Sequence, residues 1–222
     1  MVALLAPTLL ALILGLMLTG SLRGLVSEGI RGWPAILVAF ATELLLYNRP
    51  LDSQPWAISF GPAIWLATRL ILVGVLVHNA VGAPDMLRWP WLLAATGLAM
   101  NALVVALNGG HMPQSVEAAT SVWGGVRTDP DRLQNVVAMG PETRLPWLGD
   151  VLAEPTWLPR PNVVSPGDVL LSVGVAGWAF GATMRARRRL HPNPLPEGEG
   201  SRSAPGLVPE GEGSRSAHVS LP

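Results

Sequence analysis

The segment WPWLLAATGLAMNALVVALNGGHMP (residues 89–113) begins with an apolar run of helix length and stops abruptly at Asn-Gly-Gly. Residues 89–107 match the roughly 20 apolar residues that a helix needs to cross the hydrocarbon core of a bilayer. Glycine readily takes the left-handed turn that ends a helix, and proline commonly follows such an end. We therefore predict a transmembrane helix that ends next to Asn108, where a long segment outside the bilayer begins.

The composition of the whole chain agrees with a membrane protein. Half of the 222 residues are hydrophobic and 14% are charged, whereas soluble domains carry about 25% charged residues. The formal net charge is zero, which gives no indication of a nucleic-acid partner. The chain has no Cys, so disulfides, thiolate metal sites and cysteine nucleophiles are excluded.

Five segments are apolar enough to cross a bilayer, each of about 17–22 residues. They are residues 2–20, 31–47, 62–83, 89–107 and 166–184. The first lacks the basic start of a signal peptide, so we interpret it as a retained span. We therefore expect an all-α membrane protein, a bundle of about five transmembrane helices. One long extracytoplasmic segment, residues 108–165, would contain short helices.

Prolines support the starts of four spans. Pro34, Pro62, Pro90 and Pro166 each lie near the beginning of an apolar run. A missing N–H costs a helix least at that position. We therefore expect these four prolines in or near the first turns of their helices.

Arginine placement predicts the orientation. Arg185, Arg187, Arg188 and Arg189 directly follow the last span, and basic residues beside a span favour the cytoplasmic side. We expect a multi-pass protein of the bacterial cytoplasmic membrane, with the N-terminus outside and the C-terminus in the cytoplasm. Trp33, Trp89, Trp91 and Trp178 then fall near the cytoplasmic face, and Trp56 and Trp65 near the outer face.

Two regions differ in composition. Residues 1–184 form the predicted integral membrane domain, and residues 185–222 a basic juxtamembrane stretch followed by a tail. In the tail, PEGEGSRSA occurs at 196–204 and again at 209–217. This sequence has no apolar pattern with which to bury surface, so we expect the tail to be disordered.

Three polar residues lie within predicted spans at similar depth. With the orientation above, Glu43, Arg69 and Asn101 all fall in the outer third of the membrane. An ionisable residue inside a span is costly and favours a partner, so we expect a Glu43–Arg69 pair with Asn101 as its neighbour. This cluster is either a clamp between two spans or the polar floor of an outward-facing cavity.

The outer segment carries its own local signals. PQSVEAATSVW (113–123) and DPDRLQNVVAMG (129–140) look like two short helices. Ser165 as N-cap, Pro166 in the first turn and Asp168 three residues after the cap predict a helix start with a capping box.

The loop after the fourth span is a candidate ligand or partner loop. Its members are Asn108, Gly109, Gly110, His111, Met112 and Pro113, with Asp150 and Asp168 as candidates in the same outer region. A helix C-cap explains one glycine and the proline, but it does not require the asparagine, a second glycine or the methionine. The loop is therefore either a simple cap or a grip on a ligand or on residues 143–151.

At these motifs the chain resembles a known family. NGGHMP (108–113), TRLPWLGDV (143–151) and SPGDVLLSVGV (165–175) are similar to shared motifs of a bacterial multi-span membrane protein family known only as domain of unknown function 5317. Residues 20–47 are similar to its N-terminal region, and the resemblance covers most of residues 1–184. His111 stands where the family has Arg or Tyr. The resemblance implies an architecture and candidate positions, but no activity.

Three function classes remain open. The favoured one is a non-enzymatic structural or partner-binding envelope protein. The second is a carrier or binder of a small or lipid-like molecule that uses the outer polar cluster. The third is a membrane-embedded hydrolase with Asp150, Asp168 and His111, which is disfavoured because the chain has neither HExxH nor GxSxG.

Ligand and partner expectations follow. One His and two Asp on loops fall short of a metal site, so we expect no metal and no cofactor. The lipid bilayer is the first partner, and an envelope protein is the second. A homodimer through the last span is an alternative, because Gly177 and Gly181 have the small-xxx-small spacing of close helix contacts.

Overall fold

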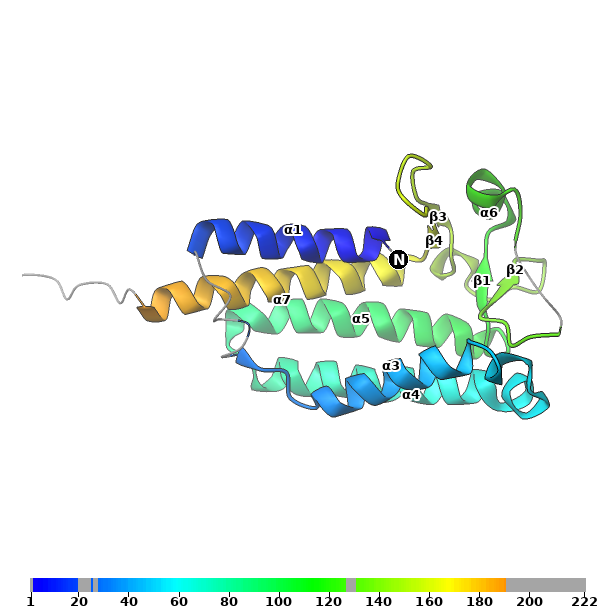
Figure 1. Ribbon diagram of the computed structural model, residues 1–222, viewed down its shortest axis with the longest axis horizontal. Helices are drawn as coiled ribbons and strands as arrows, with labels where there is room; N and C mark the ends of the chain where they lie inside the picture. The colour runs from blue at the N-terminus through cyan, green and yellow to red at the C-terminus, as the bar shows by residue number, and fades with distance from the viewer. Residues whose placement is uncertain (1, 20–24, 26–27, 127–130, 191–222) are drawn as a thin grey trace, which may run out of the picture. The chain divides into compact units, whose positions relative to one another are not determined.

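The computed structural model describes residues 2–19, 25, 28–126 and 131–190, and these residues are mostly helical (Figure 1). The helices are α1 (Val2–Thr19), α3 (Trp33–Leu46), α4 (Pro55–Gly82), α5 (Asp85–Leu107), α6 (Val116–Trp123) and α7 (Pro166–Leu190). The strands are β1 (Met112–Gln114), β2 (Val136–Ala138), β3 (Leu152–Ala153) and β4 (Val163–Val164), and the 3-10 turns are η1 (Leu51–Ser53) and η2 (Pro146–Leu148). The predicted tail repeats lie outside the described residues.

Three of these helices are long and apolar enough to cross a membrane. They are α4, α5 and the part of α7 from Pro166 to Arg185. Helices α1 and α3 lie on two further predicted spans and are apolar but shorter in their described parts. The helical class is therefore confirmed, and three helices have the length and composition of a span.

Two of the four prolines do not stand where the sequence predicted. Pro34 and Pro166 lie in the first turns of α3 and α7, whereas Pro62 and Pro90 lie inside α4 and α5. The prediction was wrong for these two because both helices begin earlier than their apolar runs. α4 starts with another proline, Pro55, which suits a first helical position.

Helix α5 packs between α7 and α4, and α1 packs on the other side of α7 (Figure 1). The backbones of α5 and α7 approach closely because glycines face each other. A Cβ at Gly97 would overlap the carbonyl oxygen of Gly167, and a Cβ at Gly174 would lie 2.6 Å from the Pro90 carbonyl oxygen. Such contacts are typical of helices that pack through small residues.

The two glycines predicted for close contact on the last span face α5. A Cβ at Gly177 would meet the Pro90 ring, and one at Gly181 would meet the Leu87 side chain. This α7 face is therefore used within the chain. Homodimerisation through these glycines stays a prediction.

The segment after α5 contains one of the two predicted short helices. α6 forms with Ser115 as its N-cap, whose hydroxyl accepts from the Ala118 N–H at 3.2 Å. The second predicted helix is wrong, because residues 136–138 form β2 in parallel with β1. Val136 and Val137 are β-branched residues, which fit strands better than helices.

The segment is attached to the connection between α3 and α4 through Asp52. This carboxylate is buried and pairs with the Arg132 guanidinium, and the Leu133 N–H donates to the Asp52 carbonyl at 2.6 Å. The side chain of Leu133 packs with Leu46 and Ala57. The segment is thus held against two helices as well as against its own strands.

The chain returns to the helices through β3 and β4 and enters α7 at the predicted capping box. The Asp168 N–H donates to the Ser165 hydroxyl at 3.0 Å, and the Ser165 N–H donates to Asp168 Oδ2 at 3.0 Å. This reciprocal pair satisfies main-chain donors that a helix start leaves open. The predicted helix start is confirmed.

Candidate functional site

A cavity of about 550 Å³ lies where α3, α4, α5 and α7 meet the segment that follows α5. We call it the loop-end cavity. Its polar lining residues are Glu43, Asn48, Arg69, Asn101, Asn135, Asp150, Asn162 and Asp168. Its apolar wall includes Phe40, Leu44, Leu98 and Leu171. The cavity therefore brings together residues that are far apart in the sequence and combines charged groups with an apolar surface.

The contact predicted between Glu43 and Arg69 is present. Arg69 Nη2 donates to Glu43 Oε2, and the guanidinium carbon lies 4.6 Å from the centre of the Trp65 ring. The Arg69 side chain is 14% exposed and that of Glu43 34%. A cation that is both paired and stacked on an aromatic face is held in one orientation. This pair joins α3 to α4 on the cavity wall.

Asn101 makes its hydrogen bonds elsewhere in the cavity. Its Nδ2 donates to Asp168 Oδ1 at 2.8 Å, and its Oδ1 accepts from the Ser165 hydroxyl at 2.8 Å. Asn101 therefore binds the start of α7 and not the Glu43–Arg69 pair. Both carboxylate oxygens of Asp168 already accept hydrogen bonds, one from Asn101 and one from the Ser165 N–H. These bonds make Asp168 a structural anchor for α7.

Asp150 is held at the cavity by its main chain. Its N–H donates to the Pro113 carbonyl at 2.8 Å, and its carbonyl accepts from the Ser115 N–H at 2.8 Å. Burial raises the pKa of its carboxyl to about 7, and the negative charge of Asp168 adds to this effect. A side-chain hydrogen bond from Gln114, at 3.4 Å, opposes the shift. Asp150 can therefore take up or release a proton near neutral pH.

Two buried polar atoms on lining residues have no hydrogen-bond partner among the described residues. They are the Tyr47 hydroxyl and the Trp65 Nε1–H. Buried polar groups are nearly always paired in folded proteins, so each such atom calls for a reason. Tyr47 ends α3 and Trp65 lies on α4, so both atoms belong to the same wall as the Glu43–Arg69 pair.

Asn108, at the end of α5, is hydrogen-bonded to Arg144 in the segment that follows. Asn108 Nδ2 donates to the Arg144 carbonyl at 2.9 Å, and Asn108 Oδ1 accepts from the Arg144 N–H at 2.9 Å. Gly109 and Gly110 both have left-handed φ values, of 69° and 89°. His111 Nδ1 lies 3.1 Å from the Gln134 carbonyl oxygen. The requirement for Asn and for two glycines is therefore a structural one.

Only part of the candidate loop reaches the cavity. Met112 lines it and packs in a buried cluster with Trp65 and Val104, while Pro113 is buried in β1. The lining does not include residues 108–111. Within the described ranges, no three His, Asp or Glu side chains lie close enough together to hold a metal ion.

Sequence reasoning missed several lining residues, among them Tyr47, Trp65, Asn135 and Asn162. A helical signal existed for two of them. Tyr47 lies four residues after Glu43, and Trp65 lies four before Arg69, so each shares a helix face with a member of the predicted pair. The two asparagines carried no such signal, because the segment's folding alone brings them to the helices.

Residues 28–180 match a family described as a family of unknown function (DUF5317). The chain belongs to this family. The matched range contains every lining residue of the loop-end cavity. No curated protein and no solved structure matches the chain.

Proposed function

We propose that the protein is a membrane-embedded binding protein for a small amphiphilic molecule, which it holds in the loop-end cavity. The observation that carries this proposal is the cavity itself. It places three carboxyl groups, one guanidinium and four amides beside an apolar wall. Ligand sites generally combine such an apolar surface with a few convergent polar groups. The polar end of the ligand would meet the polar groups, and its apolar part would lie along the helices.

The membrane placement is part of the proposal. α1 and α3 complete a five-span bundle together with α4, α5 and α7. The N-terminus and the segment after α5 lie outside the bacterial cytoplasmic membrane. Large apolar side chains on these helices support it, since Met17, Phe60 and Val81 are 78%, 63% and 75% exposed. Exposed apolar surface of this kind is normal against lipid and unfavourable in water.

The charges of the cavity favour one class of ligand. Glu43, Asp150 and Asp168 contribute carboxyl groups, whereas Arg69 contributes one guanidinium, which is already paired. An anionic group on a ligand would be repelled by this net negative charge, while an amino or hydroxyl group on the ligand could donate hydrogen bonds to the carboxylates. The ligand's polar end would therefore be neutral or cationic and would carry hydrogen-bond donors.

Because the chain has no cysteine, thiol labelling in intact cells or proteoliposomes can test whether the loop-end cavity is accessible from outside. Leu44→Cys places a thiol on the cavity wall. Leu45→Cys is the matched control, since Leu45 is the next residue, is similarly exposed (60% against 56%) and does not line the cavity. A membrane-impermeant thiol reagent added outside should label Cys at position 44 much faster than at position 45. Equal rates, or no labelling at position 44, would contradict the proposal.

The same variant tests the ligand class. Decanol, decylamine and decanoate share an alkyl chain and differ in the polar end. Decanol and decylamine should slow labelling at position 44, whereas decanoate should not. Equal protection by all three would mean that the polar groups do not select the ligand.

Docking of an envelope partner is a second candidate function, and one observation favours it. Trp147 and Trp157, both in the segment after α5, are 63% and 80% exposed. Exposed tryptophans are frequent anchors of protein interfaces. Crosslinking from these two positions to a neighbouring envelope protein would support this candidate. The hydrolase has less support, because His111 bonds to Gln134 and does not line the cavity that holds the two aspartates.

A further inference from the structure

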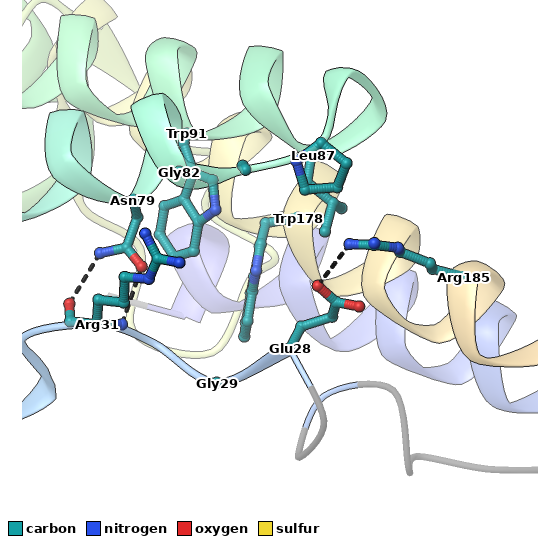
Figure 2. Close-up of a pocket in the computed structure, with 11 residues that line it drawn as sticks. Glu28, Gly29, Arg31, Asn79, Gly82, Leu87, Trp91, Trp178 and Arg185 are labelled. Atoms are coloured by element: carbon teal, nitrogen blue, oxygen red, sulfur yellow. Dashed lines mark hydrogen bonds and ion pairs between the residues drawn. The ribbon is translucent and has the colours of Figure 1, made fainter. Parts of the chain in front are cut away.

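A second pocket, of about 510 Å³, lies at the opposite ends of the helices (Figure 2). It is formed by residues 28–31, the end of α4, the start of α5 and the later part of α7. We call it the arginine-end pocket. Its lining includes Arg31 and Arg185 but only one carboxylate, that of Glu28. Its charge is therefore opposite in sign to that of the loop-end cavity.

Buried Asn79 fixes the main chain at Arg31. The Arg31 N–H donates to Asn79 Oδ1 at 2.9 Å, and Asn79 Nδ2 donates to the Arg31 carbonyl at 2.8 Å and to the Val75 carbonyl at 2.8 Å. Figure 2 shows this two-way contact beside the pocket. An asparagine that is 6% exposed and uses both ends of its amide holds its neighbour in a set position.

The two arginines of the pocket differ in their partners. Arg185 Nη1 donates to Glu28 Oε2 at 2.8 Å. The Arg31 guanidinium has no hydrogen-bond acceptor or ion-pair partner among the described residues, and it lies against Gly82, where a Cβ would overlap it. One of the two positive charges is therefore uncompensated and is presented at the pocket.

Tryptophans form the wall beside these charges. The Trp91 and Trp178 ring centres are 5.2 Å apart with the planes tilted by 43°, and Trp91 is buried. Tryptophan is enriched at the level of lipid headgroups, since its ring is apolar and its N–H is polar. A guanidinium beside aromatic rings suits a ligand that carries an anionic head on an apolar body.

We propose that the arginine-end pocket binds the phosphate group of an anionic phospholipid, with Arg31 as its anchor. Basic pockets between spanning helices on the cytoplasmic side suit such headgroups, and arginine donates well to phosphate. The sequence adds Arg187, Arg188 and Arg189 directly after the pocket's Arg185. The inference shares only the membrane placement with the function proposed above, since it concerns a different ligand in the other leaflet.

The test uses the full chain in neutral detergent and phospholipids with a fluorescent acyl chain. Fluorescence polarisation compares binding of phosphatidylglycerol with that of phosphatidylcholine. Phosphatidylglycerol should bind more tightly, and Arg31→Gln should weaken its binding by about tenfold, the loss expected for a hydrogen-bonded charge contact. Arg88→Gln is the matched control, because Arg88 lies near the start of α5 at the same end of the helices, is 48% exposed and does not line the pocket.

A second variant keeps the charge and moves it. Gly82→Ala would displace the Arg31 guanidinium, so it should also weaken phosphatidylglycerol binding while Arg88→Gln leaves it unchanged. Equal binding of the two lipids would overturn the proposal, as would equal losses in Arg31→Gln and Arg88→Gln.

Unlabelled inorganic phosphate separates the two sources of a phosphate group. Displacement of the lipid by phosphate at the concentration at which unlabelled phosphatidylglycerol displaces it would assign the pocket to free phosphate and overturn the lipid proposal. Failure of phosphate to compete supports the lipid. Thiol labelling at position 44 is independent of Arg31, so each site's proposal can fail without the other.

Discussion

The two ends of the helices present opposite chemistry. The loop-end cavity has three carboxyl groups and one guanidinium, and the arginine-end pocket has two guanidinium groups and one carboxylate. α4, α5 and α7 contribute to both. The comparison teaches that one helical scaffold keeps two sites of opposite charge apart.

The two ends are also closed differently. At the loop end, strands and the Asn108–Arg144 contact hold a folded segment over the helices. At the arginine end, Ala83 and Pro84 separate α4 from α5, and residues 28–31 line the pocket with the Arg31 main chain held by Asn79. We therefore expect the loop end to be more sensitive to changes in packing and the arginine end to be more sensitive to changes in charge.

The largest effect on stability should come from a change where α5 and α7 approach each other closely, next to the loop-end cavity. In Gly97→Val the added carbons would overlap the Gly167 carbonyl, and the backbones would have to separate, at a cost of about 3 kcal/mol or more. Thermal unfolding of purified protein should show a large loss of stability. Gly74→Val is the control, because Gly74 lies within helix α4 with open space beside it. Similar losses in both variants would mean that helix propensity, not packing, is responsible.

The next effect concerns Asp150 and depends on pH. Its pKa is about 7 in the folded protein against an ordinary value of 3.8, so between these values the folded state holds a proton that the unfolded state releases. The free energy of unfolding should therefore fall as the pH rises through this window and level off above about pH 7.

Asp150→Asn removes this titration. It should stabilise the protein by up to about 4 kcal/mol near pH 8 and change little near pH 4. Thermal unfolding at the two pH values measures the difference. The same gain at both values would show that the carboxyl's charge is not what destabilises the loop end.

The smallest expected effects concern the two ion pairs, Glu43–Arg69 and Glu28–Arg185. Glu43→Gln leaves Arg69, which is 14% exposed, without its counter-ion, and should cost about 1–2 kcal/mol. Glu28→Gln affects Arg185 at the pocket edge, where the side chain is 30% exposed, and should cost less than about 1 kcal/mol. Unfolding in the same detergent ranks the two variants. Normal insertion and stability of Glu43→Gln would rule out an energetic role for the Glu43–Arg69 pair.

Several features were accessible from the sequence because their causes are local. Helices were predicted from apolar runs over residues 31–47, 89–107 and 166–184. α5 and α7 cover the last two stretches, and α3 lies within the first. The capping box at Ser165 and Asp168 depends on residues three apart, and the Glu43–Arg69 contact on the cost of burying charge in a span.

Other features depended on contacts between distant residues. β2 replaced the predicted helix because residues 136–138 pair with β1, more than twenty residues earlier. Asn101 was expected beside the Glu43–Arg69 pair, and only the position of α7 decided that it bonds to Asp168 instead. The loop Asn108–Pro113 could be a cap or a grip, and the position of Arg144 decided that Asn108 grips the segment.

The sequence by itself determined the helical class, three helices of spanning length and composition, the start of α7, and the two polar groups that pair between α3 and α4. Apolar length, caps and buried charge act over a few residues or through a single strong energetic cost. Only the tertiary structure decided which polar residues share a cavity and which of the two arginines in the arginine-end pocket has a side-chain partner among the described residues. Both depend on how close α3, α4, α5 and α7 come to one another and to the folded segment.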